Sequence, residues 1–345
     1  MPWWDPQFHA DRRALLLLRG RIKTGLRAWF EGEGFTEVEC GALAASPGNE
    51  AHLHAFSTRR VRADGSAETL YLHTSPEFAA KKLLAAGESR IFEFARVFRN
   101  RERTRLHAPE FTMLEWYRAG AAVEQVMKDT LTLVRRAAEI SGASALRHRD
   151  RVCDPFVEAE RLTVAEAFRI HAGIELLDML DNNGVGDRDL FATRAKRAGF
   201  SVAAEDGWSD IFSKVLAAAI EPRLGRERLT LLTDYPRQEA ALARPNPSDQ
   251  RLSERFELYA CGVELANGFG ELTDPVEQRS RFEAEMNEKQ RVHGERYPLD
   301  EDFLAALASM PPASGVALGF DRLVMLATGA PRIDEVLWTP LPPDP

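Results

Sequence analysis

The segment from Arg255 to Phe269 places the strongest constraint on the fold, because apolar and polar residues alternate on either side of Cys261-Gly262. A two-residue turn there predicts a β-hairpin that pairs residue 260 with 263, 259 with 264, 258 with 265 and 257 with 266. The side chains expected on one face are those of Glu257, Tyr259, Glu264 and Ala266, and those expected on the other are Leu258 and Leu265. The hairpin therefore predicts an antiparallel sheet with one apolar face.

The two glutamates of this hairpin, Glu257 and Glu264, are expected to be diagonal neighbours in one site. Two close carboxylates repel each other unless a cation neutralises them. Mg²⁺ fits this role because it binds a few carboxylates together with the phosphate oxygens of a substrate. The alternative is that each glutamate pairs with a separate arginine at a solvated edge, and the spacing alone leaves both interpretations open.

Helical and strand patterns alternate along the rest of the chain. The residues that predict a first amphipathic helix are Leu15, Leu18, Ile22, Leu26 and Phe30, with Asp11 as the cap and Gly32 and Gly34 as stop signals. Strands are expected at residues 35–40, 70–74, 91–98, 111–118 and 256–269. Further helices are expected from Ser75-Pro76 to about residue 87, over most of 121–232 with breaks at 181–184 and 221–222, and from about 320. This arrangement predicts an α+β fold in which helices flank an antiparallel sheet.

Five arginines crowd residues 96–105, which run from the end of the strand expected at 91–98 into the loop before 111–118, and they are Arg96, Arg99, Arg101, Arg103 and Arg105. A guanidinium group is permanently charged and matches phosphate oxygens in pairs, so Arg99 is a candidate for holding a nucleotide phosphate. Because 45 basic and 53 acidic residues give a net charge of −8, a surface that generally coats nucleic acid is not expected, and an anion must bind locally. A solvated basic loop is the alternative interpretation.

Two further segments are candidates for binding. The run from Gly315 to Leu323 is typical of a glycine-rich strand end that leads into a helix, where backbone N–H groups can approach a ligand. In the strand expected at 111–118, Met113, Glu115 and Tyr117 point the same way, and the glutamate and tyrosine suit an ammonium group or a purine. The alternatives are an ordinary turn for the first segment and packing of Tyr117 against the core for the second.

Cysteine content and hydropathy narrow the cellular setting. The three cysteines, Cys40, Cys153 and Cys261, are too few and too widely spaced for a disulfide framework or a Cys-x-x-Cys metal site. No apolar run approaches the roughly 20 residues that span a bilayer, and the N-terminal sequence lacks the pattern of a signal peptide. The sequence therefore predicts a cytoplasmic protein without a membrane segment.

Several motifs resemble those of class II aminoacyl-tRNA synthetases. Those similar to motifs 2 and 3 of that class are Phe98-Arg99-Asn100, His107 to Glu115, and Gly319 to Leu323. Those that narrow the resemblance to the lysyl-tRNA synthetase branch are Thr74 to Glu77, Arg255 to Leu258, and Glu264 to Leu272. The resemblance extends from about residue 12 to 329, and it implies one class II catalytic domain over residues 1–345 with a helical insertion at about 121–232.

The resemblance begins almost at the first residue, so an anticodon-binding barrel is not expected and a free-standing catalytic domain is. Together with the segments 264–269 and 315–319, this is similar to the synthetase paralogues that ligate lysine to elongation factor P. The resemblance implies ATP-dependent activation of lysine or (R)-β-lysine as an adenylate, followed by transfer to a lysine side chain of elongation factor P. It also implies ATP and Mg²⁺ as cofactors and a homodimer, with tRNA not expected as a partner.

The resemblance further implies roles for individual residues. Arg99 would contact the α-phosphate of ATP and Arg322 its far phosphates, where both stabilise charge as pyrophosphate leaves. The other residues implied at the nucleotide are Asn100, Phe111, Glu264, Leu265 and Gly319, and those implied at Mg²⁺ are Glu257 and Glu264. The residues implied at the amino acid are Ser75, Pro76 and Glu77 at its amino group, and Tyr117 and Glu271 at its side-chain ammonium. Ala317 stands where the tRNA-charging relatives have glycine, and its methyl group is a candidate pocket wall worth about 1–3 kcal/mol of preference.

Three positions differ from the family pattern. Gly41 stands where the motif 1 proline is usual, which bears on the dimer interface. Arg101 replaces a glutamate and Ala108 replaces an asparagine, which bears on contacts to ATP or to the acceptor, and Glu102 is a candidate for the lost acidic role. Two alternatives therefore stay open: a minimal enzyme that acylates tRNA, and an inactive synthetase-like protein that only binds ligands.

Overall fold

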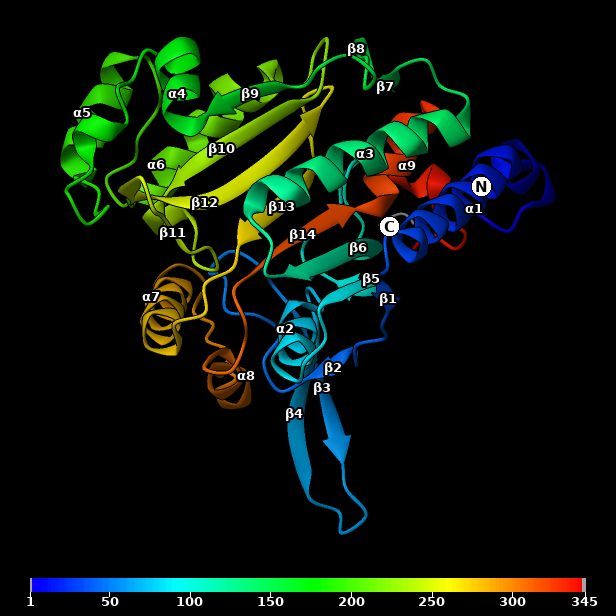
Figure 1. The fold of residues 1–345 in the computed structure, drawn as a ribbon, viewed down its shortest axis with the longest axis horizontal. Coiled ribbons are helices and arrows are strands. Elements are labelled where there is room, and N and C mark those ends of the chain that lie inside the picture. Colours follow the sequence, from blue (N-terminus) through cyan, green and yellow to red (C-terminus); the bar gives the residue numbers. More distant parts are fainter. Residues whose placement is uncertain (1, 343–345) are drawn as a thin grey trace.

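A nine-stranded sheet forms the centre of the protein in the computed structural model, which describes residues 2–342 (Figure 1). The order of its strands is β1 (Thr36–Glu37), β5 (Arg90–Phe98), β6 (Glu110–Ala119), β14 (Ala313–Gly319), β13 (Val263–Gly270), β12 (Asp249–Ala260), β10 (Thr230–Pro236) and β9 (Glu160–Thr163), with β11 (Pro245–Asn246) paired to β12. The strands from β5 to β10 pair antiparallel, whereas β1 and β9 add in parallel at the two ends. The predicted α+β class is confirmed, and the sheet is mixed at its edges.

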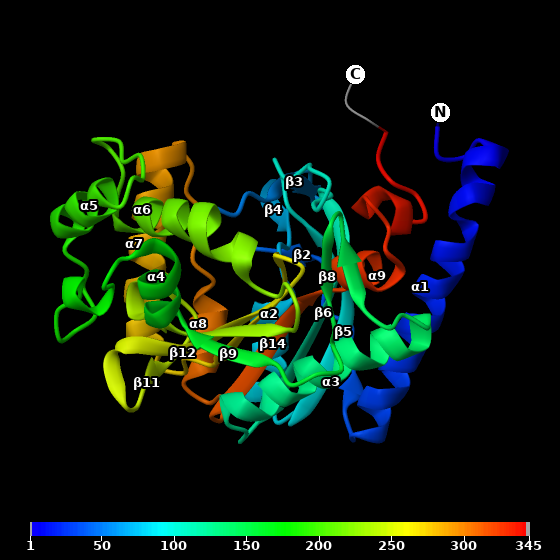
Figure 2. The same cartoon turned by 90° about the horizontal axis from the view of Figure 1, so that it is seen from above.

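Three helices cover one side of the sheet: α1 (Pro6–Gly32), α3 (Val123–Ser141) and α9 (Phe320–Thr328) (Figures 1 and 2). Their apolar residues form the main core with the buried side chains of β6, β12, β13 and β14. The first helix is present as predicted, but it begins earlier, because Asp5 and not Asp11 caps it by accepting the N–H groups of Gln7 and Phe8. No helix within residues 2–342 combines the length and apolar character that crossing a membrane requires.

A smaller layer packs beside the other side of the sheet. Its elements are α2 (Glu77–Ala85), α7 (Pro275–His293), α8 (Glu301–Leu307) and a three-stranded sheet of β2 (Leu43–Ala44), β4 (Ala67–Leu72) and β3 (Phe56–Val61). The hairpin of β3 and β4 extends away from the body (Figure 1). The sequence patterns predicted α2 and the end of β4, but they missed α7, α8 and β3. The strand expected at residues 35–40 is short, with β1 at its centre.

The segment 121–232 is helical only in part. Its helices are α3, α4 (Val164–Ala172), α5 (Arg188–Arg197) and α6 (Trp208–Val215), with short turns at Leu177–Met179, Leu216–Ile220 and Glu221–Arg223. Two other short helical turns, Arg237–Glu239 and Ile333–Val336, lie later in the chain. The prediction of a mostly helical stretch missed β9 and the hairpin of β7 (Leu146–His148) and β8 (Arg151–Cys153). Helices α4, α5 and α6 share a second core with residues of β10, so this segment extends the central sheet.

The predicted hairpin of β12 and β13 is present, but its register changes after two pairs. Residues 260 and 259 pair with 263 and 264 as predicted, whereas 258 pairs with 266 and 257 with 267. The extra residue, Leu265, makes a β-bulge in β13. The prediction that Ala266 shares a face with Glu257 is therefore wrong, because Ala266 is buried in the main core and Asn267 lies opposite Glu257.

Candidate active site

A cavity of about 350 Å³ is lined by residues of β6, β12, β13 and β14, of the arginine-rich loop between β5 and β6, and of the first turn of α9. Its wall includes these residues predicted for the site: Ser75, Glu77, Arg99, Phe111, Glu257, Glu264, Leu265, Ala317, Gly319 and Arg322. They come from parts of the chain that are far apart in sequence. The fold therefore brings most of the predicted residues around one space.

The β-bulge positions the wall that β13 contributes. Glu264, Asn267 and Phe269 all line the cavity, although Asn267 and Phe269 follow Glu264 by three and five residues, which are odd spacings. In a regular strand such residues would point to opposite faces. The extra residue at Leu265 reverses the alternation, so that both ends of β13 present side chains to the cavity.

Four predicted residues lie beside the cavity and not on its wall, and they are Asn100, Pro76, Tyr117 and Glu271. Asn100 donates its backbone N–H to the carbonyl of His54 at 2.7 Å, and its Oδ1 accepts from the N–H of Arg101 at 2.9 Å. Pro76 is buried and directly precedes α2, which begins one residue later than predicted. The Ser75 hydroxyl oxygen accepts from the N–H of Glu77 at 3.0 Å, so the side chain of Ser75 stabilises the first turn.

Three arginines line the cavity, of which Arg255 is paired with Glu257, while Arg99 and Arg322 reach it from different elements. Arg99 directly follows β5, its Nε donates to the carbonyl of Thr74 at 3.4 Å, and its guanidinium carbon lies 5.4 Å from the ring centre of Phe111. Arg322 lies in the first turn of α9 and donates to the backbone carbonyl of Glu264 at 2.9 Å. Two fixed cations on one cavity wall suit a ligand with more than one negative charge.

His107 is a cavity residue to which the sequence analysis gave no role. Its Nε2 lies 2.6 Å from Arg322 NH2, and its Nδ1 lies 2.7 Å from the hydroxyl of Thr104. Burial, followed by the charges of Arg322 and Arg99, lowers the pKa of His107 to about 4. The neutral ring accepts from Arg322 and holds its guanidinium toward the cavity.

The carboxylates of Glu257 and Glu264 combine features of both interpretations drawn from the sequence. Glu257 Oε1 accepts from Arg255 at 2.5 Å and its Oε2 accepts from the Tyr259 hydroxyl at 2.6 Å, while Glu264 Oε2 lies 3.5 Å from Arg322 NH1. Each glutamate thus has its own arginine, yet both line one cavity. Burial raises the pKa of Glu257, Arg255 counteracts this shift, and the charge of Glu264 adds to it.

The carboxylates of Glu257 and Glu264 can be compared with the ligands that a metal ion requires. Within residues 2–342, no group of three or more His, Cys, Asp or Glu side chains is arranged to hold a metal ion. Mg²⁺ commonly binds through one or two carboxylates and completes its shell with water and the phosphate oxygens of a substrate. Glu257 and Glu264 therefore fit a Mg²⁺ ion that binds together with a phosphorylated ligand.

Beyond the cavity wall lies a buried carboxyl group, Glu115, that the implied site did not include. It is 2% exposed, its Oε1 accepts from the Ser75 hydroxyl at 2.5 Å, and its Oε2 accepts from the Tyr117 hydroxyl at 2.8 Å. Burial, followed by the charge of Glu77, raises the pKa of Glu115 to about 8. The alternation of β6 already indicated Glu115 and Tyr117 as neighbours, and this signal could have added Glu115 to the site.

A buried lysine, Lys81, connects two of the predicted carboxylates. Its Nζ contacts Oε1 of Glu77 and lies 2.6 Å from Oε2 of Glu271. Burial opposes its charge, but attraction to Glu271 and Glu77 exceeds that effect and raises the pKa of Lys81. No sequence pattern singled out this residue, because its partner Glu271 lies 190 positions further along the chain.

Glu271 retains unused acceptor capacity. It is 2% exposed, its Oε2 is engaged by Lys81 Nζ at 2.6 Å, and its Oε1 has no hydrogen-bond partner within the described part of the chain. Burial raises the pKa of Glu271 to about 7 against the attraction of Lys81. A buried carboxylate oxygen without a donor is costly, and an ammonium group of a ligand would satisfy Oε1.

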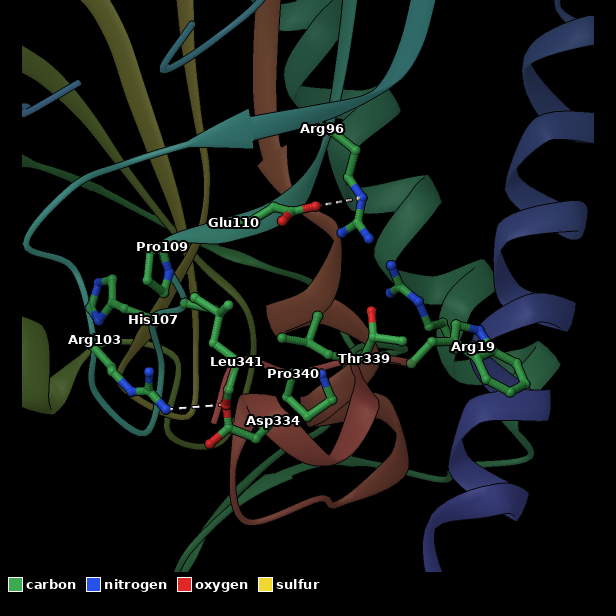
Figure 3. A pocket seen from close by; sticks show the side chains of 13 residues that line it. Arg19, Arg96, Arg103, His107, Pro109, Glu110, Asp334, Thr339, Pro340 and Leu341 are labelled. Carbon is green, nitrogen blue, oxygen red and sulfur yellow. Dashed lines mark hydrogen bonds and ion pairs between the residues drawn. The ribbon is translucent and has the colours of Figure 1, made fainter. Parts of the chain in front are cut away.

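Two other arginines of this region, Arg96 and Arg103, have partners away from this cavity. Arg96 and Arg103 line a smaller hollow together with Arg19 (Figure 3), and His107 lines both this hollow and the main cavity. Arg96 lies 3.6 Å from Glu110, and Arg103 donates to the carbonyl of Leu341 at 3.2 Å. The loop is therefore held by specific contacts, and Arg99 is the member that lines the main cavity.

The three positions that differ from the family pattern have distinct surroundings. Arg101 has a positive φ of 65° and forms an ion pair with Glu295 outside the cavity. Ala108 is buried between the main cavity and the smaller hollow. Gly41 is exposed, and a Cβ atom there would meet no described atom within 4 Å.

Comparison with known proteins identifies the family. A family model described as "tRNA synthetases class II (D, K and N)" matches residues 6–342. Proteins named "Elongation factor P--(R)-beta-lysine ligase" are similar over nearly their whole length. The protein from Haemophilus influenzae strain PittGG is 37% identical over 97% of this chain and 96% of its own, and the one from Edwardsiella ictaluri is 38% identical over 98% and 97%. The one from Pectobacterium atrosepticum is 38% identical over 97% and 96%. With these matches and a cavity that gathers motifs 2 and 3, the chain belongs to the class II tRNA synthetase family of the D, K and N group.

Proposed function

We propose that this protein is an ATP-dependent ligase that activates lysine or (R)-β-lysine as an adenylate and transfers it to a lysine side chain of elongation factor P. The names of its similar relatives support the acceptor and the amino acid. The observation that carries the proposal is the buried carboxylate of Glu271, which has unused acceptor capacity beside a cavity lined by three arginines, Arg99, Arg255 and Arg322. Such a site has one end for an ammonium group and one for phosphates.

At the nucleotide end, Arg99 contacts the α-phosphate and Arg322 the far phosphates. The other residues proposed at ATP are Asn100, Phe111, Glu264, Leu265 and Gly319, with Phe111 stacked on the adenine. The amino acid carboxylate attacks the α-phosphorus, the bond to the bridging oxygen breaks, and pyrophosphate leaves with the electron pair. The two guanidinium groups stabilise the charge that develops in this step, so the protein supplies positioning and electrostatics and no nucleophile.

Glu257 and Glu264 would hold Mg²⁺, which neutralises phosphate charge when bound. This assignment agrees with their position on the wall near Arg322. Arg255 and Tyr259 engage Glu257 through hydrogen bonds and fix its orientation. The carboxylate of Glu257 is therefore preorganised before the ligand arrives.

At the amino-acid end, Ser75, Pro76 and Glu77 are proposed at the amino group, and Tyr117 and Glu271 at the side-chain ammonium. Ala317 lines the cavity between these two ends and is proposed to limit the space for the amino acid. In the second step the amine of the acceptor lysine, after loss of a proton, attacks the carbonyl carbon of the adenylate, and AMP leaves. A homodimer in the cytoplasm is part of the same proposal, and size-exclusion chromatography with light scattering would test the dimer.

The test is intact-mass spectrometry of elongation factor P after incubation with this protein, ATP, Mg²⁺ and either lysine isomer, with tRNA charging measured in parallel. We expect a mass gain of one lysyl group on the factor and no charged tRNA. Charged tRNA with an unmodified factor would make the protein a minimal synthetase. The absence of both products and of ATP–pyrophosphate exchange would make it an inactive binding protein.

A pair of variants tests the nucleotide end. Arg99→Ala is expected to abolish ATP–pyrophosphate exchange, because the α-phosphate loses its contact with the guanidinium group. Arg96→Ala is the matched control, since Arg96 lies in the strand that Arg99 directly follows but lines the smaller hollow. Full exchange activity in Arg99→Ala would remove that assignment.

A further inference from the structure

The most unusual feature around the cavity is the buried ammonium group of Lys81, which two carboxylates share. Lys81 lies one helical turn after Glu77 in α2, so its side chain returns along the helix to Glu77. The same Nζ lies 2.6 Å from Glu271, which follows β13 directly. The side chain of Lys81 is 0% exposed, and this single contact point joins α2 to the end of β13.

Burying three charged groups together is costly unless their geometry is fixed. Nζ also donates within the helix to Glu77, so the ammonium group is held from both elements. Because both carboxylates contact the same nitrogen atom, Glu77 and Glu271 cannot move apart without breaking one of these contacts. The spacing of these two carboxylates is set by the protein before a ligand binds.

We propose that Lys81 is a positioning residue that fixes the spacing of two ammonium subsites, at Glu77 and Glu271, and thereby sets the preference between lysine isomers. This inference rests on the proposed function, in which Glu77 receives the amino group near the carboxylate and Glu271 receives the side-chain ammonium. Lys81 contacts neither group of the substrate in this scheme and acts through the two glutamates.

The spacing of the two carboxylates can discriminate between the isomers because their amino groups stand on different carbons. Lysine and β-lysine have the same atoms and charges, and they differ in the carbon that carries the amino group next to the carboxylate end. A pocket that selects by charge alone treats them alike. A pocket whose two carboxylates have a fixed separation distinguishes them, because the wrong isomer leaves a buried carboxylate incompletely paired.

Electrostatics alone predicts a different effect on isomer binding when Lys81 is removed. The carboxyl groups here are those of Glu115 and Glu271, which are buried, and of Glu77, which is partly exposed, and Lys81 is the ammonium group between Glu77 and Glu271. Removing its charge makes the pocket more negative, which by Coulomb attraction would tighten the binding of both isomers equally. If Lys81 positions the glutamates, its removal instead reduces discrimination between the isomers.

The experiment is calorimetric titration of the whole protein with L-lysine and with (R)-β-lysine, for the wild type, Lys81→Met and Lys82→Met. Lys82 is the matched control, because it lies on the same helix but pairs with Asp300 and Asp302 away from the cavity. We expect the wild type to prefer one isomer, Lys81→Met to reduce the ratio of the two dissociation constants by about tenfold, and Lys82→Met to keep it. The KM for ATP in pyrophosphate exchange is expected to stay within about twofold, which general damage to the fold would not allow.

Several outcomes would overturn the inference. They are an unchanged ratio in Lys81→Met, tighter binding of both isomers by the same factor, and a wild type that binds both isomers equally or binds neither. Lys81→Arg keeps the charge but changes the reach, and it is expected to fold and to alter the ratio. If both Lys81 variants fail to fold, the residue serves stability and the positioning role is refuted. Isomer-selective binding by a wild type that modifies no acceptor would refute the proposed function and leave the role of Lys81 intact.

Discussion

At the scale of single residues, Gly315 shows how little room the buried carboxylate cluster leaves. A Cβ atom built at this position would overlap the ring of Tyr117 and the Oε1 atom of Glu271. Gly315 also pairs with Tyr117 across β14 and β6, so neither backbone can move away independently. The glycine is therefore required by close approach and not by backbone conformation.

We expect Gly315→Ala to raise the KM for the lysine substrate by about tenfold or more, because Tyr117 and Glu271 must shift to make room. The measurement is amino-acid-dependent ATP–pyrophosphate exchange. Gly20→Ala in α1 is the control, since a Cβ there meets no described atom within 4 Å. An unchanged KM in Gly315→Ala would show that the cluster is not part of the amino-acid site.

His107 predicts a dependence of stability on pH. Its folded-state pKa of about 4 lies below its usual value of about 6.5, so between these values the unfolded chain binds more protons. Stability from this group is present above about pH 6.5 and is lost as the pH falls toward 4. The free energy of unfolding, measured with urea, should decrease more between pH 7 and pH 5 for the wild type than for His107→Gln. Equal losses in the two proteins would contradict the lowered pKa.

At the scale of elements, Asp321 joins three parts of the fold. This residue of α9 is 1% exposed, it forms an ion pair with Arg19 of α1, and it accepts from the N–H of Thr112 in β6 at 2.8 Å. Arg19 also donates to the Thr112 hydroxyl at 2.9 Å. These contacts hold the first turn of α9, which carries Arg322, against the strand that follows the arginine-rich loop.

Asp321→Asn is expected to lower the free energy of unfolding by about 3–5 kcal/mol, because it leaves the buried guanidinium of Arg19 without its counter-charge. Urea denaturation measures the loss. Asp334→Asn is the control, since Asp334 pairs with the half-exposed Arg332 and should cost at most about 1 kcal/mol. Similar losses in both variants would mean that the contacts of Asp321 do not unite the three elements.

The elements also show where sequence patterns succeed. Strands β5 and β6 and the helices α1 and α9 have strong local periodicity, and all were predicted. Helix α7 was missed because its apolar residues are few, with Phe282 and Met286 buried among polar neighbours. The β-bulge at Leu265 was missed because the alternation of residues does not reveal where an extra residue enters a strand.

At the scale of the whole molecule, the cavity lies where strands of the sheet, the arginine-rich loop and α2 meet, so a ligand there contacts parts of the chain that must fold together. A ligand that binds only the folded state stabilises it by mass action, by about 2.7 kcal/mol at a concentration 100 times its Kd. ATP with Mg²⁺ is therefore expected to raise the Tm of the protein in calorimetry.

The part of this shift that depends on Mg²⁺ should disappear when EDTA chelates the metal, and it should be absent in Glu264→Ala. Glu283→Ala is a control, because Glu283 is an exposed residue of α7 away from the cavity wall. A shift that persists in EDTA and in Glu264→Ala would remove the assignment of Mg²⁺ to this carboxylate pair.

The sequence by itself determined the α+β class, the main strands, and most of the residues around the cavity, because these depend on local periodicity and on motifs within short segments. Only the tertiary structure decided the parallel edges of the sheet, the side of β13 that faces the cavity, and the contacts of Lys81, His107 and Glu115. The physical reason is that burial and ion pairing depend on which distant segments meet. Lys81 and Glu271 acquire a common role only when α2 packs against the end of β13.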